Sequence, residues 1–155
     1  MSNLPYRIGI PMVGGDSSGE QWPERLLAAH NLERAAAGLP LFAGHWKLDA
    51  VAAERCQDMI RDGYFAHVDP DNQPGNYAAV LAAFGVTSYR WAGENLALNN
   101  YPDDAVARAM VTWMNSPTHR DNILSPDFDT IGGAAANRAD GTILLAIIFT
   151  GGAAL

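Results

Sequence analysis

Two histidines and one glutamate occur where side chains can do chemistry. His67 lies in an irregular stretch directly after a helical pattern, and His119 lies in a short turn after another helical pattern. Histidine binds metal ions and exchanges protons near neutral pH, and loops held by helices often carry sites. Glu94 lies between small and apolar residues, where a buried carboxylate needs a partner such as a protonated or metal-bound histidine. We therefore take these three residues as the candidate site.

Each of the three also has a purely structural interpretation. The other two histidines are His30 and His45, and a single histidine is more often a surface or core residue than a ligand. For Glu94, the residues alone favour a helix cap or hydrogen bonds to backbone amides. The sequence contains no His-Glu-x-x-His, no paired cysteines, no Gly-x-Ser-x-Gly and no phosphate-binding loop. No local motif therefore decides between these interpretations.

Ser116 lies three residues before His119 and directly before Pro117. Serine is a preferred helix N-cap residue, and proline is favoured at the first helical position. We therefore predict that Ser116 caps a short helix. A nucleophilic role beside His119 is the less favoured alternative.

Five helical segments are expected to position these residues. Apolar residues at three- and four-residue spacing, with glycine or proline at the ends, predict the helices. The predicted ranges are 22–38, 48–61, 77–84, 102–114 and a turn over 116–124.

The end of the chain changes to the pattern of strands. Residues 131–136 and 142–149 read as two strands, joined by a hairpin loop that contains Asp-Gly. The second strand is apolar on both faces, so it is expected to be central and covered by helices on both sides. Helices followed by a terminal hairpin predict a layered α+β domain.

Charge and composition exclude several classes of partner. The net charge is −7, and the basic residues are scattered, so neither nucleic acid nor an anionic membrane surface is an expected partner. No apolar run approaches the roughly 18–20 residues of a membrane span. The single cysteine, Cys56, lies in a helical apolar pattern and is predicted to be a buried, inert thiol.

The chain divides into three parts by composition. We assign residues 1–21 to an N-terminal arm or linker, 22–151 to the folded domain and 152–155 to a C-terminal tail. The arm is either a loose terminus or a segment that packs on its own domain or on a neighbouring copy. Its sequence does not match a secretory signal peptide, so a signal either was removed or is not used.

Several motifs resemble the CAP superfamily, which comprises the cysteine-rich secretory, antigen 5 and pathogenesis-related 1 proteins and is also called the SCP domain. The resemblance covers residues 22–151, and residues 113–124 resemble the bacterial, disulfide-free branch. Six pieces occur in the family's order: 27–34 with 38–41, 46–59, 63–67 (Gly-Tyr-Phe-Ala-His), 93–96 (Gly-Glu-Asn-Leu), 113–124, and 128–132 with Phe149.

The resemblance implies a three-layer α-β-α sandwich with a central antiparallel sheet. It also implies a cleft lined by two histidines and two glutamates. His67, Glu94 and His119 match three of these positions, and Ser116 occupies the fourth. Asn95, the third residue of the Gly-Glu-Asn motif, is also expected to line the cleft. The serine puts in doubt any mechanism that needs two carboxylates.

Three functions follow as hypotheses. We rank first a non-enzymatic cleft protein, extracellular or on the cell surface, that binds a small ligand, a lipid or a protein partner. Zinc is the expected metal, with His67 and His119 as ligands and Glu94 either as a third ligand or orienting a histidine.

The second hypothesis is a metal-dependent hydrolase that acts on extracellular peptide or cell-wall material. The third is a structural component of a filament or virion, a homo-oligomer assembled through residues 1–21.

Overall fold

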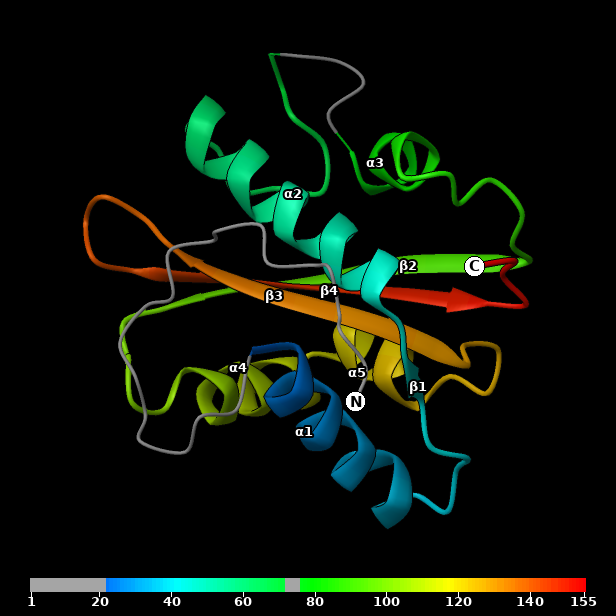
Figure 1. Cartoon of the computed structure of the whole chain (residues 1–155). Helices are drawn as coiled ribbons and strands as arrows, with labels where there is room; N and C mark the ends of the chain where they lie inside the picture. The colour runs from blue at the N-terminus through cyan, green and yellow to red at the C-terminus, as the bar shows by residue number, and fades with distance from the viewer. Residues whose placement is uncertain (1–21, 72–75) are drawn as a thin grey trace, which may run out of the picture.

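A four-stranded sheet forms the middle of the molecule in the computed structural model, which describes residues 22–71 and 76–155 (Figure 1). The strands are β1 (Ala43–Gly44), β2 (Trp91–Asn99), β3 (Thr130–Asn137) and β4 (Ile143–Gly151), in the order β1-β3-β4-β2. β4 pairs antiparallel with both neighbours, whereas the two-residue β1 runs parallel to β3. Every residue of β4 is buried, which confirms that this strand is central.

Helices cover both faces of the sheet. α2 (Trp46–Asp62) and α3 (Tyr77–Ala83) lie on one face, and α1 (Trp22–Ala36), α4 (Ala105–Met114) and α5 (Pro117–Leu124) lie on the other (Figure 1). The predicted three-layer α-β-α sandwich is therefore confirmed.

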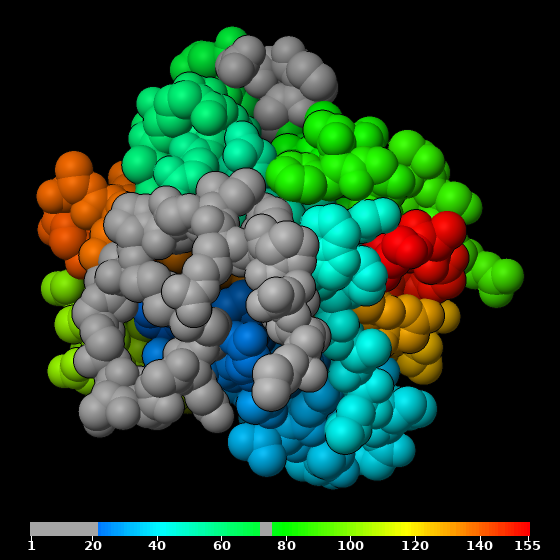
Figure 2. All heavy atoms as spheres, in the orientation of Figure 1, coloured from blue at the N-terminus to red at the C-terminus, as the bar shows by residue number. Residues whose placement is uncertain are grey.

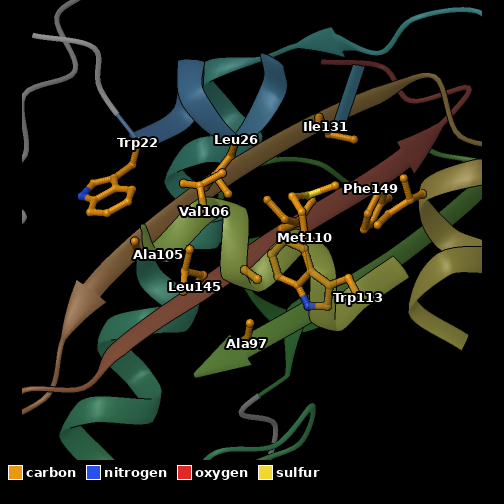
Figure 3. Close-up of a cluster of buried hydrophobic side chains, with 14 of the residues drawn as sticks. Trp22, Leu26, Ala97, Ala105, Val106, Met110, Trp113, Ile131, Leu145 and Phe149 are labelled. Carbon is orange, nitrogen blue, oxygen red and sulfur yellow. The ribbon is translucent and has the colours of Figure 1, made fainter. Parts of the chain in front are cut away.

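β4 divides its side chains between two apolar clusters, because successive residues of a strand point to opposite faces. Leu145, Ile147 and Phe149 pack against α1 and α4, in the cluster that also contains Trp113 (Figure 3). Leu144, Ala146 and Ile148 instead join the cluster beneath α2 and α3. The unbroken apolar run of this strand thus serves two cores.

The sequence analysis missed both the two-residue β1 and the longer strand β2. The residues of β2 are Trp-Ala-Gly-Glu-Asn-Leu-Ala-Leu-Asn, with no β-branched residue and no alternation of apolar with polar side chains. Both Glu94 and Asn95 are buried although they point to opposite faces. The predicted helix over 102–114 is also corrected, because α4 begins at Ala105 after turns at 102–104.

The first turn of α2 lies directly against the backbone of β3 at Gly132. A Cβ atom on Gly132 would stand 2.1 Å from the carbonyl carbon of Leu48 and 2.2 Å from the nitrogen of Asp49. In the same turn, the Asp49 carboxylate accepts a hydrogen bond from the Gly133 N–H at 3.0 Å. A side chain at position 132 would therefore push α2 away from the sheet.

α5 is attached to α1 by a buried arginine. The Arg34 guanidinium donates to backbone carbonyls at the end of α5 and beyond it, those of Ile123 (3.2 Å), Ser125 (2.5 Å) and Phe128 (3.3 Å). It also donates to the Pro40 carbonyl at 2.9 Å. These contacts fix the C-terminal end of the helix that carries His119.

The two ends of the chain differ in what the structure describes. Residues 152–155, assigned to a tail, lie against the domain: the Ala154 N–H donates to the Ser88 carbonyl at 2.9 Å, and Leu155 packs on the cluster beneath α2 and α3. In the space-filling view the C-terminal residues (red) adjoin the segment before β2 (Figure 2). The arm assigned to residues 1–21 lies outside the described residues.

Two further expectations from the sequence, an inert buried Cys56 and the lack of a membrane-spanning helix, can be compared with the structure. Cys56 is buried, and burial raises the pKa of its thiol, as expected of an inert core cysteine. Over residues 22–71 and 76–155, no helix is both long and apolar enough to cross a membrane.

Burial of His30 makes the stability of the fold depend on pH. The ring is fully buried against Trp113 and Phe149, and Nδ1 contacts the Leu26 carbonyl oxygen at 2.7 Å. Burial lowers the pKa of His30 from 6.5 to about 4, although the contact with Leu26 acts in the opposite direction. The unfolded chain therefore binds more protons than the folded chain between these two pH values, and acid favours unfolding.

We predict that this histidine lowers the free energy of unfolding by about 3 kcal/mol as the pH falls from 6.5 to 4. In His30→Leu this contribution is absent, so the difference in stability between variant and wild type should change by that amount. Urea unfolding of both proteins across this range measures it, and other titrating groups cancel in the comparison. A difference that does not vary with pH would refute the prediction.

Candidate functional site

Three elements converge at the candidate site: the segment after α2, strand β2 and the start of α5. The Nδ1 atom of His67 lies 2.9 Å from Oε1 of Glu94 on β2. The neighbouring Asn95 donates through Nδ2 to the backbone carbonyl of His119 at 3.1 Å. The charge of His67 also acts on His119, whose pKa is lowered first by burial and then by this charge. The structure therefore brings the three predicted residues to one place.

The contact between Glu94 and His67 determines which ring nitrogen carries the proton. The side chain of Glu94 is fully buried, whereas that of His67 is 53% exposed. A carboxylate can only accept a hydrogen bond, so Nδ1 of His67 must be the protonated nitrogen. Nε2 of a neutral His67 then carries a lone pair that can bind a metal ion or accept a proton.

Arg55 on α2 completes this arrangement and was not identified from the sequence. Its guanidinium contacts both carboxylate oxygens of Glu94, Nε to Oε2 at 2.7 Å and Nη2 to Oε1 at 3.2 Å. Nη2 also donates to the backbone carbonyls of Ala66 (2.9 Å) and His67 (3.1 Å). One buried cation thus holds both the carboxylate and the loop that carries His67.

The ion pair is closed to solvent and linked to further polar groups. Burial by itself lowers the pKa of Arg55, but the hydrogen bonds and charges of Glu94 and, to a smaller extent, Tyr64 together outweigh it and raise the pKa. Nη1 of Arg55 donates to the Tyr64 hydroxyl at 2.8 Å, and that hydroxyl donates to Asp58 at 2.8 Å. Burial, followed by the contact with Asp58, raises the pKa of Tyr64 to about 12.

A sequence signal for Arg55 did exist. The residue lies four positions after Val51 and four positions before Met59, both buried apolar residues of α2. A side chain at that spacing faces the core, and a charged residue there must be paired. The spacing indicates a buried cation, although it does not identify Glu94 as its partner.

Ser116 has a different role from the one predicted. It occupies the N-cap position of α5, with extended φ and ψ and Pro117 after it, but its side chain makes no capping hydrogen bond. Its Oγ instead lies 2.9 Å from Nδ1 of His119. The helix start was therefore predicted correctly, whereas the capping role of the hydroxyl was wrong, because the His119 ring three residues on takes that hydrogen bond.

Asn95 connects the sheet to α5. Besides donating to the His119 backbone, its side chain accepts a hydrogen bond from Nδ2 of Asn122 at 2.9 Å. Asn95 is fully buried. Its amide is therefore committed to positioning α5, whereas the sequence analysis placed it among the residues that line the cleft.

The site suits two nitrogen ligands better than a ligand set that includes Glu94. Both oxygens of Glu94 already contact Arg55, and one of them also contacts His67. Across residues 22–71 and 76–155, no three His, Cys, Asp or Glu side chains are arranged to hold a metal ion together. Glu94 is therefore placed to orient His67, and the imidazoles of His67 and His119 remain as the candidate metal donors.

A hollow of about 300 Å³ lies elsewhere, where α1, the start of α2 and β3 meet. It contains the carboxylates of Glu24 and Asp49, each in the first turn of a helix, where acidic side chains are stabilised by the helix dipole. Burial, with the charge of Glu24 added, raises the pKa of Asp49 to about 6. None of the predicted site residues lines this hollow. We therefore keep the region where His67, Glu94 and His119 converge as the candidate site.

Removing the buried Arg55 should destabilise the fold far more than removing the exposed Arg61 of the same helix. We predict that Arg55→Met lowers the free energy of unfolding by about 3–5 kcal/mol, because it leaves Glu94 buried without its charge partner. Arg61→Met is the matched control, since the Arg61 side chain is 57% exposed, and it should cost at most about 1 kcal/mol. Urea unfolding measures both variants, and similar losses would contradict this account of the site.

Comparisons with known proteins agree with this fold. The model of the cysteine-rich secretory protein family (CAP) matches residues 27–151. The uncharacterized protein YkwD of Bacillus subtilis (strain 168) is 35% identical over 116 residues, which are 75% of this chain and 43% of that protein. The chain thus spans less than half the length of this relative.

Two solved structures have the same architecture. An outer surface protein of Borrelia burgdorferi matches with a TM-score of 0.71 and 20% identity, over 83% of this chain and 90% of that one. An extracellular protein containing a SCP domain, from Bacillus anthracis, matches with a TM-score of 0.64 and 27% identity, over 81% of this chain and 39% of that one. With the family match covering most of its length, the chain belongs to the CAP, or cysteine-rich secretory protein, family.

Proposed function

We propose that this chain, in its metal-bound form, is a non-enzymatic extracellular binding module whose cleft holds a divalent metal ion, zinc, through Nε2 of His67 and of His119. The observation that carries the proposal is the 2.9 Å contact between Nδ1 of His67 and a Glu94 carboxylate that Arg55 fixes. Histidine ligands of zinc commonly donate their other ring N–H to a carboxylate in this way.

The two histidines differ in how far their hydrogen bonds already fix the tautomer that a metal ion needs. His67 has a carboxylate partner, so its tautomer is already the one that leaves Nε2 for a metal. His119 has the Ser116 hydroxyl, which can accept from Nδ1–H or donate to bare Nδ1. Zinc binding at Nε2 of His119 would select the first arrangement. His67 is then the preorganised ligand, and His119 becomes one when the metal arrives.

Two protein nitrogens leave coordination positions open for a further ligand. Zinc is usually four-coordinate, so water, a small molecule or a group from a protein partner would complete the shell. We favour binding over hydrolysis because Ser116 stands where the family has its second glutamate, and the Glu94 carboxylate is occupied by Arg55. Neither residue is then a carboxylate available as a general base.

An extracellular or surface location is supported by the two structural relatives, one an outer surface protein and the other an extracellular protein. The assembly hypothesis, in which the chain builds a filament or virion, depends on residues 1–21 and therefore stays a prediction.

Zinc titration by calorimetry tests the proposal. We predict that Glu94→Gln weakens zinc affinity by about 10–100-fold, as expected for a group that orients a ligand, and that His67→Ala and His119→Ala each weaken it further. His45→Asn is the matched control, because His45 caps α2 through Nδ1 and asparagine is also a good N-cap. It should bind zinc as the wild type does. Equal affinity in wild type and His119→Ala would overturn the metal site.

A further inference from the structure

The hydroxyl of Ser116 is a polar group of the site that contacts a histidine instead of capping its helix. It occupies an N-cap position without making a capping hydrogen bond, and its Oγ lies 2.9 Å from Nδ1 of His119. Both residues are only part-buried, so a small molecule can reach them. From this geometry we infer that Ser116 is a nucleophile, activated by His119, that accepts an acyl group from neutral esters when the cleft holds no metal.

The distance between the two side chains is that of a nucleophile and its base. A serine hydroxyl is a weak nucleophile until a neighbouring base takes its proton. A base within about 2.6–3.2 Å meets the geometric requirement, and general base catalysis contributes roughly 10²–10⁴-fold in rate. Nδ1 of His119 satisfies this requirement in the arrangement where the hydroxyl donates to it.

The start of α5 also offers donors for a developing oxyanion. The first backbone N–H groups of a helix have no intrahelical acceptor. Proline at position 117 has no N–H, so the available groups are those of Thr118 and His119. The Ser116 hydroxyl does not accept from them, and backbone donors near a nucleophile can stabilise the charge on an attacked carbonyl oxygen. The net charge of −7 favours neutral over anionic acyl groups.

The reaction is balanced with ester and water alone. Oγ of Ser116 forms a bond to the acyl carbon while its proton passes to Nδ1 of His119. The ester C–O bond then breaks, and the leaving alcohol takes the proton from Nδ1. Water next attacks the acyl-serine, again giving a proton to Nδ1, and the proton returns to Oγ as the carboxylic acid leaves.

Metal binding would switch this activity off, a consequence that rests on the proposed function. A metal on Nε2 of neutral His119 requires the proton to be on Nδ1, which then donates to Ser116. Nδ1 can no longer accept the serine proton. The same histidine would therefore act as a base in the metal-free protein and as a ligand in the metal-bound protein.

A fluorophosphonate probe tests the nucleophile directly on the full, metal-free chain. Oγ attacks phosphorus, fluoride leaves, and the serine proton is released through His119. Intact-mass spectrometry should show one added phosphonyl group, which peptide mapping places on Ser116. We expect Ser116→Asn to abolish labelling while keeping a good N-cap. We expect His119→Ala to slow labelling by about 100-fold or more.

Ser125→Ala is the matched control, because Ser125 lies at the other end of α5 and its hydroxyl accepts from the Asp127 N–H. This variant should be labelled at the wild-type rate. No labelling of a folded wild type, or labelling unaffected by His119→Ala, would overturn the inference. Added zinc separates the two proposals: labelling that zinc does not slow leaves the nucleophile standing and counts against His119 as a ligand. Zinc binding without any labelling supports the metal site and overturns the nucleophile.

Discussion

The ion pair between Arg55 and Glu94 is the interaction on which the site depends. Burying two charges together destabilises a fold unless their hydrogen-bonding groups are all satisfied. Here the guanidinium, besides pairing with Glu94, donates hydrogen bonds to backbone carbonyls and to the Tyr64 hydroxyl. The pair joins α2 to β2 and fixes the orientation of His67 as well. The same atoms therefore support the stability of the fold and the orientation of His67, so a change that weakens the ion pair affects both.

The second half of the site is held by a different kind of interaction. α5 is fixed by contacts to backbone carbonyls: Arg34 on those at its end and Asn95 on that of His119. The side chain of His119 is left with a hydroxyl partner that can donate or accept. The site thus pairs one histidine whose protonated ring nitrogen is determined with another whose protonated ring nitrogen can change, and the proposed ligand binding and nucleophile activation would both use that difference.

The sequence predicted the helices and strands of the three layers better than the side-chain contacts that hold the site. Periodicity located the helices and the apolar run of β4, because both depend on local spacing. β2 was not predicted because its buried polar residues, Glu94 and Asn95, remove the alternation of apolar and polar side chains that indicates a strand. The three site residues were predicted from residue type and position and then matched to the family's pattern, whereas the role of Arg55 depends on a partner 39 residues away, which no local pattern reveals. The hydroxyl of Ser116 was misassigned because cap position and cap hydrogen bond usually occur together.

Gly132 carries a consequence for anyone who would transplant this cleft into another scaffold. The backbone of α2 rests where a methyl group would stand, and a normal carbon contact needs about 3.5–4.0 Å. Arg55 lies six residues beyond Asp49, about 9 Å farther along the helix, so its reach to Glu94 depends on that close seating. A graft of His67, Glu94, His119 and Arg55 alone would reproduce the residues without the spacing. The glycine, which touches nothing in the site, belongs to the minimal transferable unit.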